Sequence, residues 1–410
     1  MSKTLNPNTS AKEKFISAGW LVALIGALTA LSPLAIDTYL PAIGAIAEEM
    51  NTSHGNVEAT LALYMIGFAV GQFFGGAFSD LKGRKPVGFA GLLLFTLASL
   101  WISVGGSIYQ LWTARFIQAI GGGFTTVVGL AIIRDLFDGV EIARKLTAIS
   151  MVRMLAPLIA PMFGTLLLRF FGWRSIFIFF TIYAALMFLV FSLRIKETKA
   201  KSKEPEQWKS TLENYGKVIR NKQAIAFMLM GGLGFAGMFA FISGASSLFI
   251  GYYGVTTAEF PFYFSTNVLM LMILSALNVR LVKQQSPERL LKYGLRLQFL
   301  AGGVFLLASL LQPSLMLVFP AIALFVGAQG LIYGNASGIV MNYFPTMGGT
   351  ANATMGIVQF ILGGITSFVL SRLQGGESLL PLAAIMLSCT FLANLLYFGL
   401  SRRKPAISHP

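Results

Sequence analysis

The residue best placed to do chemistry in this sequence is Asp37, the single ionisable group in the apolar run from Trp20 to Leu40. A carboxyl group inside a membrane-spanning segment is costly, so such residues usually serve function. We therefore predict that Asp37 binds and releases a proton. The alternative is that Asp37 only caps the end of its helix.

Arg115 lies in another apolar segment, one helical turn before Gln118. An arginine there either extends to the near end of its helix or acts inside the membrane. Counted from the outer ends of their helices, Arg115 and Asp37 lie at similar depth. Two opposite charges at one depth can pair directly or through water, so we assign both residues to proton coupling.

A third segment, from Ser150 to Thr165, combines Arg153 with Pro157, Pro161 and Gly164. Two prolines four residues apart and a nearby glycine predict a kinked, thin helix. That helix is either a hinge or a static kink. Arg153 either lines a cavity and selects the charge of a substrate, or binds a backbone carbonyl.

The elements that must position these residues are membrane-spanning helices. The chain is 55% hydrophobic and 11% charged, with a mean hydropathy of +0.72, whereas soluble domains carry about 25% charged residues. Apolar windows of about 20 residues recur along the whole sequence. We expect an all-α integral membrane protein with twelve spans at about 17–41, 57–79, 86–105, 108–133, 145–168, 175–195, 224–250, 260–279, 291–311, 315–341, 349–371 and 378–400.

The spans divide into two groups of six, which fits duplicated bundles around a central cavity. We expect a cytoplasmic tail at 1–16, an N-terminal six-helix bundle at 17–195, a cytoplasmic linker at 196–222, a C-terminal six-helix bundle at 223–400 and a second cytoplasmic tail at 401–410. Within the linker, residues 207–219 carry apolar side chains at helical spacing, which indicates a helix on the membrane surface.

The net charge of +15 comes from 31 Lys and Arg residues against 16 Asp and Glu. Most of the basic residues fall on one side of the membrane if the N-terminus is cytoplasmic, so the charge indicates topology and contact with membrane lipid rather than nucleic-acid binding. Two His and one Cys provide no metal cluster, and no familiar catalytic motif occurs. We expect no enzyme activity, no catalytic residue, no metal and no cofactor.

Acidic residues are scarce inside the expected spans. We place Glu48, Glu49 and Glu58 in the external loop after the first span, and the second group of spans contains no Asp or Glu. With Asp37 as the one membrane acid, we expect few protons per transport cycle. In the second span, Gly67, Gly71 and Gly75 share one face, which predicts close helix packing.

The turn from Gly76 to Pro86 carries a charged cluster, Asp80, Gly83, Arg84 and Lys85. It resembles the signature loop of the major facilitator superfamily and departs from it once, at Leu81. The Arg-x2-Gln-x2-Gly pattern from Arg115 resembles the helix 4 motif of the superfamily, which is associated with proton transfer. The segment around Pro161 resembles the antiporter motif of its drug exporters, with Ala160 and Thr165 in place of two glycines.

Together with the stretch Pro33–Ala42, these motifs resemble the Bcr/CflA (bicyclomycin/chloramphenicol resistance) family of twelve-helix drug:proton antiporters. The resemblance implies the major facilitator fold and a bacterial inner membrane exporter of phenicol, bicyclomycin or sulfonamide drugs, with the proton as coupling ion. It also implies that Asp80 and its neighbours hold a cytoplasmic gate against the start of helix 11, and that Pro157, Pro161 and Gly164 form an antiporter hinge. Arg84 and Lys85 can instead be plain membrane anchors.

We assign polar and aromatic residues of the spans to a substrate cavity: Tyr39, Tyr64, Gln118, Arg153, Phe235, Phe239, Asn267, Asn335 and Gln359. The 35 Phe residues and the scarcity of fixed charge suit lipophilic cargo. The alternatives are a transporter of a natural metabolite, a channel, and a receptor or scaffold that transports nothing. We expect a monomer.

Overall fold

The computed structural model describes residues 17–199, 208–311, 314–373 and 378–401, and these residues form helices and short connections. Twelve helical segments are long and apolar enough to cross a membrane, which confirms the expected number of spans and the all-α class. The helices are α1 (Ala18–Asp37), η3 (Leu40–Ala42), α2 (Ile43–Glu49), α3 (His54–Lys82), α4 (Arg84–Val104), α5 (Ile108–Leu136), α6 (Val140–Phe171), α7 (Arg174–Arg194), α8 (Trp208–Arg220), α9 (Lys222–Ser246), η4 (Ser247–Tyr252), α10 (Phe260–Leu281), α11 (Pro287–Leu310), α12 (Leu315–Tyr343), α13 (Gly348–Leu373) and α14 (Leu380–Ser401).

The first span is longer than expected. α1 ends at Asp37, but the chain continues through η3 and α2, so that Ala18–Glu49 forms one apolar segment. Asp37 consequently lies well inside this segment rather than close to its outer end. The estimate of its depth from the sequence was too shallow, because Pro41 was taken as the end of the span.

α3 also begins earlier than expected. The Ser53 hydroxyl accepts a hydrogen bond from the Asn56 N–H at 3.2 Å, which satisfies one of the free N–H groups of the first turn and fixes the helix start at His54. Glu58 therefore lies in the second turn of α3. Its assignment to an external loop was wrong.

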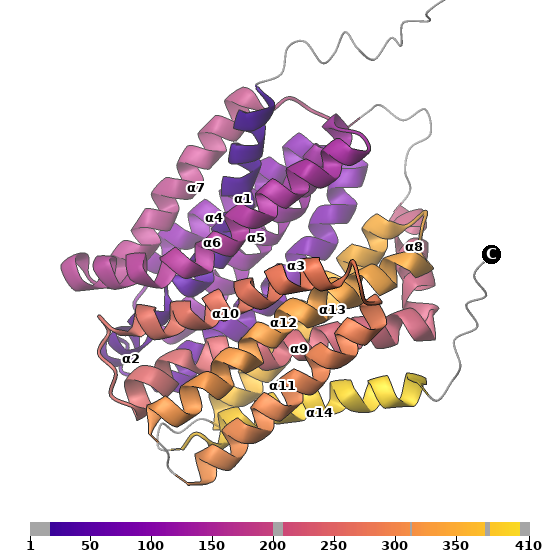
Figure 1. The fold of residues 1–410 in the computed structure, drawn as a ribbon. Coiled ribbons are helices and arrows are strands. Elements are labelled where there is room, and N and C mark those ends of the chain that lie inside the picture. Colours follow the sequence, from indigo (N-terminus) through magenta and orange to yellow (C-terminus); the bar gives the residue numbers. More distant parts are fainter. Residues whose placement is uncertain (1–16, 200–207, 312–313, 374–377, 402–410) are drawn as a thin grey trace, which may run out of the picture.

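The helices form two groups that lie side by side (Figure 1). We call α1–α7 the first half and α9–α14 the second half. α3 packs against α13, and α6 packs against α10, so these helices join the two halves. We call the end of the molecule that holds α2 and η4 the α2 end, and the end that holds α8 and residues 82–85 the α8 end.

The glycines of α3 allow a close helix contact. A methyl group added at Gly67, Gly71 or Gly75 would lie 2.5, 2.4 or 2.9 Å from a backbone atom of α5. Such distances leave no room for a larger side chain, so small residues set the separation of α3 and α5. The prediction that this face packs closely is confirmed.

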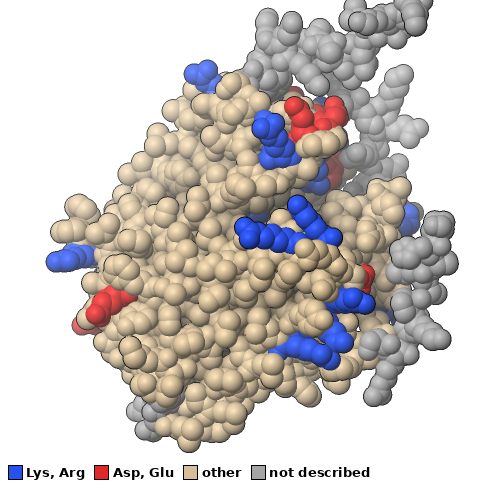
Figure 2. Space-filling view, viewed as in Figure 1, with Lys and Arg blue, Asp and Glu red and all other residues tan. Residues whose placement is uncertain are grey.

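α8 begins after residues 200–207, which are outside the described residues, and contacts α3, α9 and α13. This places a helix where the surface helix at 207–219 was expected, although residue 207 is outside the described residues. The tails 1–16 and 402–410 are outside them as well. On the face shown in Figure 2, most Lys and Arg side chains gather toward the α8 end, and much of the remaining surface is uncharged.

Candidate functional site

Asp37 is buried, with 4% of its surface exposed, in the last turn of α1. The ion pairs among the described residues join Arg84 to Asp80, Arg84 to Asp135, and Arg174 to Glu49. Asp37 takes part in none of them, and no hydrogen bond reaches its side chain from the described residues. Asp37 is therefore a carboxyl group in an apolar span without a counter-ion, a site at which proton binding relieves the cost of charge.

α6 passes directly over the segment that carries Asp37. A methyl group added at Gly164 would lie 2.0 Å from the carbonyl oxygen of Thr38, the residue after Asp37. Pro157 and Pro161 lie inside α6, where each removes a backbone hydrogen bond of the helix. The structure thus brings the predicted hinge into contact with the predicted proton site, although the two are far apart in the sequence.

Arg115 is completely buried in α5. Its guanidinium carbon lies 4.8 Å from the ring centroid of Tyr39, 4.4 Å from that of Tyr64 and 5.9 Å from that of Phe177. Aromatic faces attract a cation, and the attraction grows when water is excluded. The positive charge of Arg115 is therefore stabilised by an aromatic cage rather than by a carboxylate.

Two hydrogen bonds fix the orientation of Arg115. Its Nη1 donates to the Ala35 carbonyl at 3.1 Å and to Gln118 Oε1 at 2.8 Å, and Gln118 Nε2 donates in turn to Ser99 Oγ at 2.7 Å. Ala35 lies in the last turn of α1, where carbonyl groups lack helical donors. Arg115 consequently supports the turn that carries Asp37, but the direct pairing of Arg115 with Asp37 that we considered is absent.

The cavity residues assigned from the sequence fall into separate groups. Tyr39, Tyr64 and Gln118 surround Arg115. Phe235 and Phe239 of α9 stack at 5.7 Å, and Phe360 of α13 contacts both Phe235 and Phe68 of α3 edge-on. This second group, an aromatic cluster, lies between the two halves, and the buried Gln359 is next to it in the sequence.

The remaining three assigned residues lie elsewhere. Asn335 Nδ2 donates to Asn278 Oδ1 and to the Leu331 carbonyl, each at 2.7 Å, so Asn335 joins α12 to α10 within the second half. Asn267 Nδ2 donates to the Tyr263 carbonyl at 2.7 Å. Arg153 has a buried Nε without a partner, and Tyr333 of α12 lies within electrostatic range of it. Of these three, Arg153 has the unused donor that a ligand would require.

The charged turn between α3 and α4 is held within the first half. Arg84 pairs with Asp80, donates from Nε to Asp135 Oδ2 at 2.9 Å and from Nη1 to Ser79 Oγ at 2.9 Å. Lys85 Nζ donates to the Ser192 carbonyl at 2.9 Å. Among the described residues, no hydrogen bond or ion pair joins Asp80 to the start of α13, so the gate contact between them stays a prediction.

Glu197, which follows α7, completes this turn. Its carboxylate accepts hydrogen bonds from the backbone N–H groups of Arg84 at 2.8 Å and Lys85 at 3.0 Å, the first residues of α4. Gly83, with φ +101°, leaves space for this carboxylate, because an added methyl group would lie 2.5 Å from Glu197 Oε2. No local pattern indicates this cap, since 112 residues or more separate its partners.

We expect Glu197→Gln to lower the stability of the turn by about 0.5–1 kcal/mol, a typical value for an exposed capping carboxylate. Burial raises the pKa of Glu197, but the backbone hydrogen bonds outweigh it and hold the pKa below its usual value of 4.5. Because the pKa is lower in the folded state, the stabilisation is complete above the usual pKa of 4.5 and is lost as the pH falls through the folded-state pKa. In detergent, the melting temperature of Glu197→Gln should therefore be lower than that of wild type at neutral pH, and this difference should shrink in acid. An equal difference at both pH values would contradict this role.

The structure shows one buried acid that the sequence analysis missed. Glu58 of α3 has no exposed surface, and Ser247 Oγ of η4 donates to its Oε1 at 2.5 Å. A helix start at His54, after the Ser53 cap, places Glu58 inside the span. The expectation of a single membrane acid was therefore wrong.

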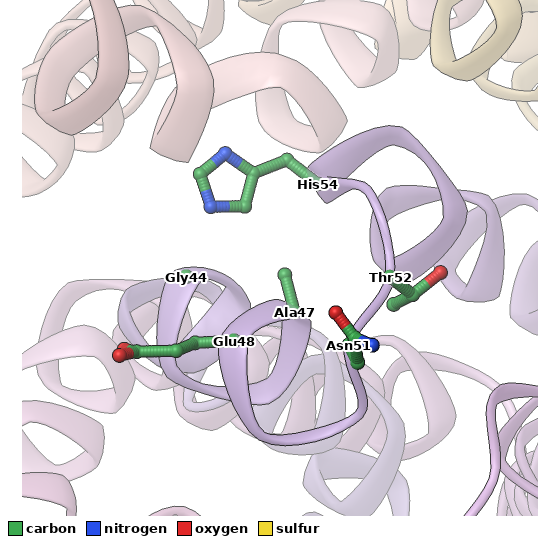
Figure 3. Close-up of a pocket in the computed structure, with 6 residues that line it drawn as sticks. All are labelled: Gly44, Ala47, Glu48, Asn51, Thr52 and His54. Atoms are coloured by element: carbon green, nitrogen blue, oxygen red, sulfur yellow. The ribbon is translucent and has the colours of Figure 1, made fainter.

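An open groove of about 610 Å³ lies at the α2 end, beside the start of α3. It is lined by Gly44, Ala47, Glu48, Asn51, Thr52 and His54, and Figure 3 shows the His54 ring between the start of α3 and α2. None of the residues assigned to the site from the sequence lines this groove. Among the described residues, no group of His, Cys, Asp and Glu could hold a metal ion.

Comparison with known proteins identifies similar chains. The Major Facilitator Superfamily model matches residues 25–367. A bicyclomycin resistance protein homolog of Haemophilus influenzae is 31% identical over 93% of this chain and 96% of its own length. The multidrug resistance protein MdtL of Salmonella typhi is 25% identical over 93% of this chain and 95% of its own length.

Solved structures share the fold. A partially occluded inward open conformation of the xylose transporter XylE from E. coli superposes with a TM-score of 0.71 at 14% identity, covering 94% of this chain and 97% of that one. A bacterial homolog of the human lysosomal transporter Spinster, in an inward-facing and unoccupied conformation, gives a TM-score of 0.70 at 16% identity, covering 94% and 97%. At these identities the likeness concerns the arrangement of the helices.

Proposed function

Because this chain belongs to the Major Facilitator Superfamily and is a transporter rather than an enzyme, we propose that it is a proton-coupled multidrug antiporter that exports amphipathic antibiotics. The observation that carries the proposal is Asp37, a buried carboxyl without a counter-ion beside the α6 prolines. Relatives named for bicyclomycin resistance and multidrug resistance support the same function.

Orientation follows from charge. The α8 end holds most of the Lys and Arg residues, and cytoplasmic loops carry such an excess, so the α8 end is cytoplasmic and the α2 end faces outward. Both chain termini are then on the cytoplasmic side. The relatives come from bacteria, which supports a location in the bacterial inner membrane.

The coupling follows from the cost of burying charge. When the outer side is open, Asp37 meets water and takes up a proton, and the neutral carboxyl can then be enclosed. When the inner side opens, the proton leaves and the drug binds the deprotonated form. Proton and drug bias one conformational equilibrium in opposite directions, which is sufficient for exchange.

Two features of the site suit a lipophilic cargo with one polar group. The aromatic cluster of Phe68, Phe235, Phe239 and Phe360 offers ring faces between the halves. Arg153 offers a buried guanidinium with a free donor. Arg115 is already enclosed by its cage and is assigned to support of the Asp37 turn rather than to contact with the drug.

The proposal predicts that drugs dissipate a proton gradient through this protein. Liposomes with a pH-sensitive dye inside and an imposed pH gradient should respond to at least one member of a panel of phenicols, sulfonamides, bicyclomycin and cationic dyes. The response should saturate with drug concentration and vanish when an ionophore removes the gradient. A panel that moves no protons would reject drug antiport and favour transport of a natural metabolite.

A further inference from the structure

Glu58 is an acid that the proposed mechanism does not use. It lies in the second turn of α3 near the α2 end and is fully enclosed. Its Oε1 accepts a hydrogen bond from Ser247 Oγ, and its Oε2 has no partner. A buried carboxyl with one free oxygen needs an explanation, because the unpaired oxygen has lost its hydrogen bonds to water without gaining others.

The Glu58–Ser247 contact joins the two halves. Three side-chain hydrogen bonds cross between the halves among the described residues, and the other two run from Thr165 Oγ1 to the Thr257 carbonyl at 3.2 Å and from Ser265 Oγ to the Leu158 carbonyl at 2.9 Å. Thr165 and Ser265 lie, like Glu58, in the part of their helices nearer the α2 end. These bonds therefore hold the halves together on the outer side.

No cation in the described part of the chain pairs with Glu58. Arg115 of α5 is held by its cage and by Ala35 and Gln118, and Arg372 of α13 is exposed and lies over the rings of Trp112 and Phe368. The charged residues at the start of α9 and of α4 lie at the α8 end.

One remaining titratable neighbour is Tyr39, whose hydroxyl forms a hydrogen bond with Thr60 Oγ1 of α3. The others lie closer to the α2 end: Glu48, Glu49 and His54. Glu49 pairs with Arg174, and the other two are exposed. Among the residues that the structure describes, the enclosed carboxyl thus meets the Ser247 hydroxyl but no positive charge.

We propose that Glu58 is a second proton-binding residue, which must be neutral before the outer ends of the two halves can close on Ser247. Taking a carboxylate out of water without a cation is costly, and the single Ser247 hydroxyl donor offsets that cost only in part. When the outer ends separate, water reaches Glu58 and stabilises its ionised form. Proton binding at Glu58 and outer closure therefore favour each other, as linkage requires.

This role rests on the proposed function, because it assumes that the halves alternate between outer and inner opening, but it is separate from Asp37. Asp37 lies at the contact of α1 with α6 inside the first half, whereas Glu58 lies at the contact between halves. The open groove beside His54 brings water to within one helical turn of Glu58 along α3. External protons therefore have a short route to this carboxyl.

The separation of the outer ends tests the proposal without any drug. Spin labels on Gly106→Cys, in an exposed and open position of the first half, and on Met316→Cys, exposed at the start of α12, report it by double electron–electron resonance. Cys389, a buried free thiol, is removed as Cys389→Ala. In nanodiscs, we expect the ratio of closed to open outer ends to rise at least tenfold from about pH 9 to about pH 5, since tenfold corresponds to about 1.4 kcal/mol.

Glu58→Gln keeps the size and hydrogen-bonding capacity of the protonated acid, so we expect it to remain closed at every pH. Ser247→Ala should shift the equilibrium toward open outer ends. Glu48→Gln, which removes an exposed carboxylate from the same end, should titrate like the parent. The proposal is overturned if Glu58→Gln titrates like the parent, or if the parent shows no change with pH.

Comparison with Asp37→Asn separates this inference from the proposed function. If Asp37→Asn keeps the pH-dependent change and Glu58→Gln loses it, Glu58 controls the outer ends, even if no drug on the panel moves protons. If drugs drive proton flux and Glu58→Gln leaves the distances unchanged, drug antiport stands and the role of Glu58 is rejected.

Discussion

Asp37→Asn is expected to abolish drug-driven proton flux in liposomes, with a loss of at least tenfold, which corresponds to about 1.4 kcal/mol of coupling free energy. Asparagine has nearly the same size and fills the same buried site, but it cannot bind or release a proton in this pH range. The variant should therefore fold, but because it mimics the protonated acid it should bind drug more weakly than wild type. Proton flux through the dye assay and drug binding by tryptophan quenching give the two measurements.

The size of this effect follows from the surroundings of Asp37. The residue is buried without a cation in this structure, so its ionised form is favoured only when the site is open to water. Asp37→Glu, which keeps the carboxyl, should retain part of the flux, and Glu48→Gln should retain all of it because Glu48 is exposed. Equal flux in Asp37→Asn and wild type would show that Asp37 is structural and that protons bind elsewhere.

Gly164→Ala is expected to be the most damaging small substitution outside the titratable residues. The added methyl group would lie 2.0 Å from the Thr38 carbonyl oxygen and 2.8 Å from its carbon, both of them backbone atoms that cannot rotate away. Overpacking of this kind costs about 1–3 kcal/mol. Because Thr38 follows Asp37, separation of α6 from α1 would also displace the proton site, so both the melting temperature in detergent and the drug-driven flux should fall.

Gly303→Ala is the matched control. Gly303 also lies inside a helix, α11, but nothing lies within 4 Å of an added methyl group. Alanine is a better helix former than glycine by about 0.8–1.0 kcal/mol, so this variant should melt at the same temperature as wild type or slightly higher. If Gly164→Ala behaves like Gly303→Ala, α6 does not pack on the end of α1 as the structure shows.

The sequence by itself determined the class, the twelve spans and the family. Helices in a membrane must satisfy their backbone hydrogen bonds internally, so long apolar runs leave little choice of structure. The signals for Asp37, Arg115 and the glycines of α3 are equally local, because a charge or a glycine stripe in an apolar run is visible without neighbours. The burial of Asp37 and Arg115 follows the same logic and is seen in the structure.

Contacts between distant segments were decided only by the tertiary structure. Similar depth favoured an ion pair of Asp37 with Arg115, but depth does not fix the direction of a side chain around its helix, and Arg115 points into the rings of Tyr39, Tyr64 and Phe177 instead. Likewise Asp80 was expected to act on the start of α13, whereas its ion pair among the described residues is with Arg84, within the first half.

Glu58 shows the physical reason most clearly. In the sequence it follows two exposed acids, and polar residues around a helix start look like a loop. Its burial depends on Ser247, 189 residues away, which closes over it from the other half. Local pattern can indicate that a residue lies in a helix, but only the packing of one helix against another decides whether its charge is left without water.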